Sequence, residues 1–172
     1  VDSDCANELS NLFLECVVAP SFDKTALTIL SKKTNLRILQ LSPESINTCN
    51  RTQVRSILGG ILVQEKDDLP IDEKDWSTPT KLSPSATIME DLSFAWRLVR
   101  HVRSNAIVVA SARQSLGIGA GQMNRVGSAK LALEAAGKSA KGSVMASDGF
   151  FPFDDTVRLA ASYGINAIIQ PG

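Results

Sequence analysis

Apolar residues recur along the chain with two spacings, one typical of helices and one typical of buried strands. Within residues 87–103 the apolar side chains fall three or four positions apart, and acidic residues precede basic ones, as the helix macrodipole favours. Short uninterrupted apolar runs instead predict strands that are buried on both faces. On these criteria we expect helices at 4–16, 24–32, 87–103, 124–136 and 154–163, strands at 36–41, 106–110, 143–146 and 165–169, and a strand or turn at 115–121.

The order of these elements predicts the fold class. Helices alternate with strands that are apolar throughout, so we expect an α/β protein with a layered sheet covered by helices. Residues 51–65 carry apolar side chains around Gly59-Gly60, which favours strands that approach another backbone closely. Residues 65–86 are acidic and rich in Ser, Thr and Pro, and we expect an exposed connection there.

Composition and charge exclude several classes of partner and location. Hydrophobic residues make up 44% of the chain, as in an ordinary globular protein. Eighteen basic residues balance eighteen acidic ones, so we expect no nucleic-acid partner and no membrane partner. No apolar run approaches the roughly 20 residues that span a bilayer. The three cysteines favour reduced thiols and an intracellular, cytoplasmic location.

Two polar motifs lie before and after the apolar run at 106–110. Asn105, in Ser104-Asn105, has an amide donor and an acceptor that can hold a carbonyl or carboxamide, although a helix C-cap is the alternative. The segment 117–121 supplies three glycines before a helix, and Arg125 adds a forked cation, an arrangement that can receive an anion or a planar ligand. Tight packing is the alternative explanation for the glycines.

The third motif, at residues 147–155, gathers three phenylalanines around Pro152 among three carboxylates. Aromatic faces there can hold a flat heterocycle, and Asp155 can bond its ring nitrogens. The alternative is that the phenylalanines are core residues and that Asp154 or Asp155 is only a helix N-cap. The only histidine, His101, lies on a predicted helix and is expected at the surface. The cysteines lack the paired spacing of metal ligands, and the sequence contains no His-x-Glu motif. We therefore expect no zinc site and no other metal-ligand cluster of this kind.

These motifs, in this order, resemble the bifunctional purine enzymes that join AICAR formyltransferase to IMP cyclohydrolase. The resemblance rests on the residues just described and on three segments nearer the start, Ala6-Asn7-Glu8-Leu9, residues 15–20 and Asn35-Leu36-Arg37, so it covers nearly the whole chain. It implies a formyltransferase domain of two similar halves with a cytidine-deaminase-like fold but no zinc. Residues 1–64 would end the first half, 65–86 would be the connection, and 87–172 would form the second-half core.

The resemblance also implies an activity and its site residues. The family transfers a formyl group from 10-formyltetrahydrofolate to AICAR, at sites formed between the subunits of a homodimer. By position, Asn105, Arg125 and Phe150 would contact AICAR, with Asn105 also positioning the reacting groups, and Val126 and Asp155 would contact the folate. A monovalent cation near Ser104 and Asp148 is a further implication.

Two departures from the family pattern lead us to expect an incomplete piece that is inactive alone. The chain has no Lys-His dipeptide, which supplies the family's proton relay, and it has no cyclohydrolase domain. A separate departure is Asp154, which stands where the family has an arginine and changes the local charge. The absence of an initial Met and the final apolar run also suggest a piece of a longer chain, in which a targeting segment could precede Val1. The alternative function is a noncatalytic folate- or nucleotide-binding or scaffold protein that keeps the fold.

Overall fold

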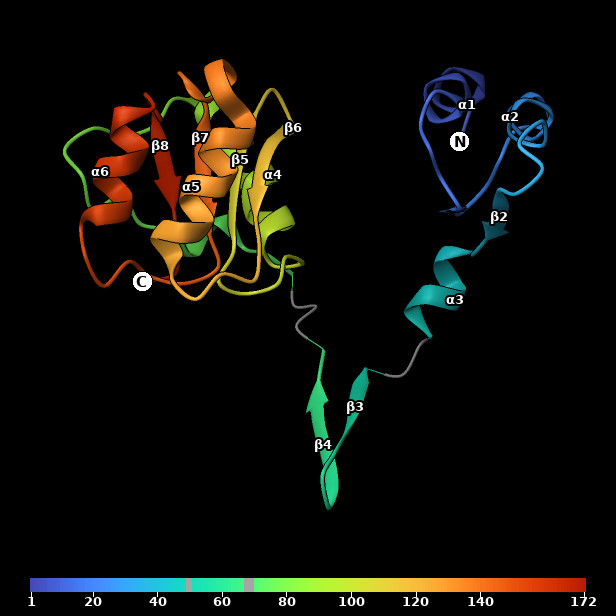
Figure 1. Ribbon diagram of the computed structural model, residues 1–172, viewed down its shortest axis with the longest axis horizontal. Helices are drawn as coiled ribbons and strands as arrows, with labels where there is room; N and C mark the ends of the chain where they lie inside the picture. The colour runs from blue at the N-terminus through green and yellow to red at the C-terminus, as the bar shows by residue number, and fades with distance from the viewer. Residues whose placement is uncertain (49–50, 67–69) are drawn as a thin grey trace. The chain divides into compact units, whose positions relative to one another are not determined.

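The computed structural model describes residues 1–48, 51–66 and 70–172 (Figure 1). The chain divides into two compact units, Val1–Leu69 and Pro70–Gly172. Each unit has its own secondary structure, and each is described separately below. The predicted mixture of helices and strands is confirmed, with the strands arranged in three small sheets.

The first unit contains two helix-to-strand segments. Helices α1 (Ser3–Ser10) and α2 (Lys24–Leu30) pack through a small core of Ala6, Ala26 and Leu30. Strands β1 (Cys16–Ala19) and β2 (Arg37–Gln40) form a parallel pair. A short helix α3 (Pro43–Asn47) follows, with Ser42 as its N-cap.

The prediction of one helix over 4–16 is wrong in its second half. Helix α1 begins earlier, with the Asp2 side chain accepting a hydrogen bond from Cys5 N, and it ends at Ser10 with Asn11 as C-cap. Cys16 then opens β1, because its backbone pairs with Arg37 of β2. Leucine and phenylalanine at positions 12 and 13 mimic a continuing helix face, but both side chains are exposed.

Strands β3 (Thr52–Ile57) and β4 (Gly60–Glu65) form an antiparallel hairpin, which confirms the strands predicted around Gly59-Gly60. Gly59 has φ +79°, a left-handed conformation that glycine adopts without steric cost. Every residue of both strands is exposed.

The second unit is built around a four-stranded mixed sheet in the order β6-β5-β7-β8. Strand β5 is antiparallel to both β6 and β7, and β8 is parallel to β7. The unit begins with a 3-10 turn, η1 (Glu73–Asp75), inside the predicted connection. The remaining elements are α4 (Ala86–Val99), β5 (Ile107–Ser111), β6 (Gln114–Gly119), α5 (Arg125–Ala136), η2 (Gly137–Ala140), β7 (Val144–Ser147), α6 (Asp155–Ser162) and β8 (Ala167–Ile169).

Helices cover both faces of this sheet (Figure 1). Alternate residues of β5 enter different cores: Val108 packs with Leu92 of α4, whereas Val109 packs with Leu133 of α5. Because β5 and β7 are buried on both faces, their sequences are continuously apolar rather than alternating. The layered sheet predicted from these runs is therefore confirmed.

Helix α5 lies unusually close to strand β6. A Cβ atom on Gly117 would lie 2.0 Å from the carbonyl oxygen of Ala132, and one on Gly119 would lie 1.9 Å from that of Ser128. Only glycine permits such an approach of helix backbone to strand backbone. The alternative explanation of tight packing is confirmed for these two glycines.

Candidate functional site

The three polar motifs meet at one end of the sheet, where β5 begins and β7 ends. Ile107 pairs with Ser147, so the next residues outward, Ala106 and Asp148, also lie side by side. Asp148 Oδ1 accepts a hydrogen bond from Ala106 N at 3.0 Å, and Asp148 N donates to Ala106 O at 3.2 Å. The side chain of Asp148 is therefore fixed to the segment that carries Asn105.

Arg125, the first residue of α5, completes an ion pair at this point. Its Nη2 lies 3.5 Å from Asp148 Oδ1, and the two side chains are only 24% and 15% exposed. The guanidinium lies against Gly149, where a Cβ atom would be 1.8 Å from Nη2. Within the described residues, the buried Nε of Arg125 has no hydrogen-bond partner.

Asn105 is held by two hydrogen bonds to the segment that leads into α5. Its Nδ2 donates to Gln122 O at 2.9 Å, and its backbone oxygen accepts from Ser128 Oγ at 2.6 Å. The alternative interpretation of Asn105 as a helix C-cap is wrong, since α4 ends at Val99 with Arg100 in the cap position. The carboxamide instead bonds the segment that leads into α5, and the backbone of Asn105 adjoins Ala106, which Asp148 contacts.

The glycine-rich segment positions the start of α5. Gly121 has φ +66°, and its N–H donates to Arg103 O at 2.8 Å. Asn124 is the N-cap of α5, and its side chain accepts from Gly127 N at 2.8 Å. These contacts place Arg125 and the half-buried Val126 in the first turn of the helix, beside the cluster.

The phenylalanines divide between core and surface. Phe151 packs against the core beneath α5 and α6, as the core alternative predicted. Phe150 and Phe153 are 61% and 73% exposed, so their rings are free to contact a ligand or another surface. Phe150 directly follows Gly149, which the Arg125 guanidinium contacts, so its backbone adjoins the polar cluster.

The two carboxylates after the phenylalanines have separate local partners. Asp154 occupies the N-cap position of α6 without a capping hydrogen bond from its side chain, and it pairs with Arg158 at 2.7 Å. Asp155 Oδ1 accepts from Thr156 N at 2.6 Å and from Thr156 Oγ1 at 3.2 Å. Among the described residues, no hydrogen bond or ion pair links Asp155 to Asn105 or Arg125.

The cluster combines groups suited to a polar, flat ligand. Arg125 supplies a guanidinium that Asp148 holds in place, and Asn105 supplies a carboxamide. Groups fixed in this way can bind and orient a ligand with little reorganisation. In the described part of the chain, no three His, Cys, Asp or Glu side chains gather as metal ligands do, and the monovalent cation stays a prediction.

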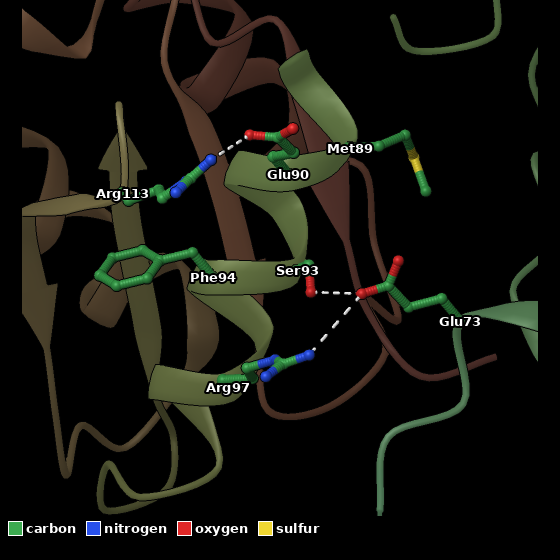
Figure 2. Close-up of a pocket in the computed structure, with 7 residues that line it drawn as sticks. All are labelled: Glu73, Met89, Glu90, Ser93, Phe94, Arg97 and Arg113. Carbon is green, nitrogen blue, oxygen red and sulfur yellow. Dashed lines mark hydrogen bonds and ion pairs between the residues drawn. The ribbon is translucent and has the colours of Figure 1, made fainter. Parts of the chain in front are cut away.

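A second polar region, on α4, lies apart from the predicted site residues. A pocket of about 310 Å³ is lined there by residues of α4, together with Glu73 and Arg113 (Figure 2). Glu90 pairs with Arg113 at 2.7 Å, and Glu73 accepts a hydrogen bond from Ser93 Oγ at 2.5 Å. The hydrogen bond to Glu90, and then its charge, raise the pKa of the Arg113 guanidinium above its ordinary value. Arg97 lies 3.9 Å from Glu73. The contacts of Glu73 with Ser93 and Arg97 therefore join η1 to α4.

Sequence reasoning missed two contributors to the site. Ser128 lies one turn into α5 among small residues, and nothing in its local pattern distinguishes it from a packing residue. Gln122 contributes a backbone carbonyl, which no side-chain motif can reveal. Asp148 was noticed as part of a motif, but its role as the link between Ala106 and Arg125 depends on strand register.

The fold and the site define the class as a mixed α/β protein with a polar cluster at the end of its main sheet. The family model described as AICARFT/IMPCHase bienzyme matches residues 1–135, more than half of the chain. The chain belongs to this AICARFT/IMPCHase family.

Its relatives include proteins named bifunctional purine biosynthesis protein PurH. Those of Prochlorococcus marinus strains NATL1A and MIT 9211 are 63% and 67% identical to it over all 172 residues, which cover 33% of each relative. The protein of that name from Synechococcus sp. strain CC9311 is 63% identical over the whole chain, covering 32% of its length. The chain thus spans about one third of these curated relatives. None of the helices in the described part of the chain is long and apolar enough to cross a bilayer.

Proposed function

We propose that this chain is part of an AICAR formyltransferase, which transfers the formyl group of 10-formyltetrahydrofolate to AICAR in purine synthesis. The observation that carries the proposal is the contact of Asp148 with Arg125 and with the backbone next to Asn105, which unites three separate motifs. Relatives 63% to 67% identical over the whole chain support it, because they are named as purine biosynthesis proteins.

The proposed substrate contacts follow the chemistry of the side chains. Arg125 and Asn105 would bind AICAR through charge and through its carboxamide, while the exposed ring of Phe150 would stack on the heterocycle. Val126 and Asp155 would contact the folate. In the transfer, the AICAR amine forms a bond to the formyl carbon, the bond from that carbon to the folate nitrogen breaks, and a proton moves from the amine to that nitrogen.

The residues of this chain bind and orient in this proposal, and they do not supply the proton relay. The family's Lys-His pair is absent from the sequence. The cluster itself contains a guanidinium, a carboxamide and a carboxylate already paired with that guanidinium, and it contains no histidine. We therefore expect this chain to bind substrates without turning them over.

The same proposal includes the finer fold and assembly. The second unit would be one half of a duplicated, cytidine-deaminase-like formyltransferase domain, with 87–172 as its core, 1–64 as the end of the first half and 65–86 between them. The complete enzyme would be a cytoplasmic homodimer that also carries a cyclohydrolase domain. The proposed core at 87–172 is supported by the position of the four-stranded sheet and the helices that cover it, which all lie within residues 86–169.

A noncatalytic folate- or nucleotide-binding protein, or a scaffold, is the second candidate. It is favoured by one observation: the polar cluster is fully formed within this chain although the Lys-His pair is missing. Under this alternative, Asn105 and Arg125 would bind the same class of ligand without a subsequent reaction. The two candidates differ in whether added segments of the parent chain restore formyl transfer.

Calorimetric titration of the chain with AICAR and with a folate analogue tests the proposal. Asn105→Ala should weaken AICAR binding at least about tenfold, and Asp155→Ala should weaken folate binding. Asn166→Ala and Asp23→Ala are matched controls at exposed positions outside the cluster and should leave both affinities unchanged. Equal losses in control and site variants, or no loss in either, would refute the assignment of these residues.

A further inference from the structure

Gln170 lies at the end of the main sheet where the polar cluster is found. Strand β8 runs parallel to β7, and its last residue, Ile169, pairs with Ala146, so both strands leave the sheet at the same edge (Figure 1). That edge is also where β5 begins, because β5 is antiparallel to β7. As the first residue after β8, Gln170 therefore lies beside the loop that follows β7 and carries Phe150.

A hydrogen bond joins Gln170 to that loop. Its Oε1 accepts from Phe151 N at 2.9 Å, although the two residues are 19 positions apart in the sequence. Within the described part of the chain, no other hydrogen bond holds the backbone of residues 150–153. The ring of Phe151 packs against the core. Phe151 is thus held both by its ring and by its N–H group, and this fixes the peptide that joins it to Phe150.

The backbone on the other side of Phe150 is anchored as well. Ser147 is fully buried, and its Oγ donates to Gly149 O at 2.7 Å and accepts from Gly149 N at 3.4 Å. The Arg125 guanidinium also lies against Gly149. Phe150 therefore presents a 61% exposed ring from a backbone that is anchored on both sides. A ring held in this way loses little conformational freedom when a ligand binds to it.

The exposure of Gln170 shows which part of its side chain matters. The residue is exposed, so its carboxamide fills no space in the core, and the contact that it makes is the hydrogen bond to Phe151. The acceptor oxygen, rather than the volume of the side chain, is therefore the feature that connects β8 to the loop. A substitution that keeps the volume and removes the acceptor isolates this contribution.

We propose that Gln170 is a positioning residue for the substrate site, which holds Phe151 N–H and thereby keeps the Phe150 ring in place to stack on the heterocycle of AICAR. Gln170 acts through Phe150 and not on the reacting atoms. The inference rests on the proposed function for the identity of the ligand. The anchoring of the loop, in contrast, can be measured with no ligand present.

Hydrogen exchange of the Phe151 amide, followed by NMR in the chain without ligand, tests the anchoring. Gln170→Met keeps the approximate size of the side chain but removes the acceptor, so exchange of this amide should become at least about tenfold faster. Gln170→Glu supplies an acceptor again and should restore the protection. Gln114→Met makes the same change at an exposed position at the opposite end of the sheet, and it should leave the Phe151 amide unchanged.

A double-mutant cycle, measured by calorimetric titration with AICAR, tests the effect on the site. Gln170→Met should weaken AICAR binding by about threefold to tenfold when Phe150 is present. In a Phe150→Ala background the same substitution should have no further effect, because the ring that Gln170 positions is gone. A role of Gln170 in overall stability would instead weaken binding equally in both backgrounds, so the cycle separates positioning from stability.

The two measurements also separate this inference from the proposed function. Unchanged exchange of the Phe151 amide in Gln170→Met would overturn the inference, and so would an equal loss of affinity with and without the Phe150 ring. If the parent chain binds AICAR and Gln170→Met binds it equally well, the inference alone is overturned. If the parent chain binds no AICAR while Gln170→Met still frees the Phe151 amide, the proposed function fails and the positioning role fails with it.

Discussion

Three aspartates in one short region differ in what surrounds them. Asp148 is nearly buried and binds a backbone N–H and a guanidinium, whereas Asp154 forms an exposed pair with Arg158. Asp155 bonds to the residue that follows it. The sequence could place all three near a strand and a helix, but only strand register shows that Asp148 is the one that joins the motifs.

Asp148→Ala is expected to destabilise the chain by about 1–3 kcal/mol, because Ala106 N–H and the Arg125 guanidinium would lose a shared, mostly buried acceptor. Urea unfolding monitored by circular dichroism measures the difference. Asp154→Ala removes an exposed helix pair and should cost less than about 0.5 kcal/mol. Similar losses in both variants would contradict the role given to Asp148.

The turn between β5 and β6 is a second residue-scale feature. Ala112 and Arg113 have φ of +50° and +57°, and their N–H groups donate to the carboxylate of Asp91 at 3.1 Å. Two left-handed residues suit a tight hairpin, but they strain any residue that has a Cβ atom. Asp91 compensates for this strain by binding both turn amides.

Ala112→Gly should therefore stabilise the chain, by about 0.5–1 kcal/mol, since glycine adopts the positive φ without strain. Thermal unfolding should show a melting temperature a few degrees higher. Ala135→Gly, at an exposed position of α5, is the control and should lower stability by a similar amount. A lower melting temperature for Ala112→Gly than for the parent chain would show that the turn is not strained.

At the scale of elements, the sequence predicted most of the second unit. Strands β5 and β7 were recognisable because burial on both faces makes them continuously apolar, and α4 because its apolar spacing is regular. The first unit was harder, since β1 forms only through its pairing with β2. Helix α3 was missed although Ser42-Pro43 is a recognisable helix start.

The contact between α5 and β6 gives an element-scale prediction. Gly119→Ala should destabilise the chain by about 1–3 kcal/mol, because the new Cβ atom would lie 1.9 Å from the Ser128 carbonyl and the helix must move. Gly60→Ala is the control, as its nearest neighbour would be 3.9 Å away. Chemical denaturation of the three proteins compares them, and equal stability of Gly119→Ala and the parent chain would contradict the close packing.

At the scale of the whole molecule, the two units differ in how much core they contain. The second unit contains the two larger clusters of buried apolar residues. In the described part of the first unit, the buried cluster consists of Ala6, Ala26 and Leu30. Small cores rarely offset the conformational entropy lost on folding. The first unit therefore depends on further contacts for stability to a greater degree than the second.

Residues 70–172 expressed alone should unfold in one cooperative thermal transition, and residues 1–69 alone should not. Circular dichroism and differential scanning calorimetry of the two pieces measure this directly. The intact chain provides the reference transition. A cooperative transition in residues 1–69, or its loss in residues 70–172, would contradict the assignment of the main core to the second unit.

The strand order of the main sheet also has a consequence for synthesis on the ribosome. Strand β6 follows β5 at once along the chain, whereas β7, the other neighbour of β5, emerges only after α5 and η2. A nascent chain can thus close the β5–β6 hairpin early, but the other edge of the buried strand β5 stays unpaired until β7 has been synthesised. During that interval the apolar segment Ile107–Ser111 is the part of the unit most in need of protection by a chaperone.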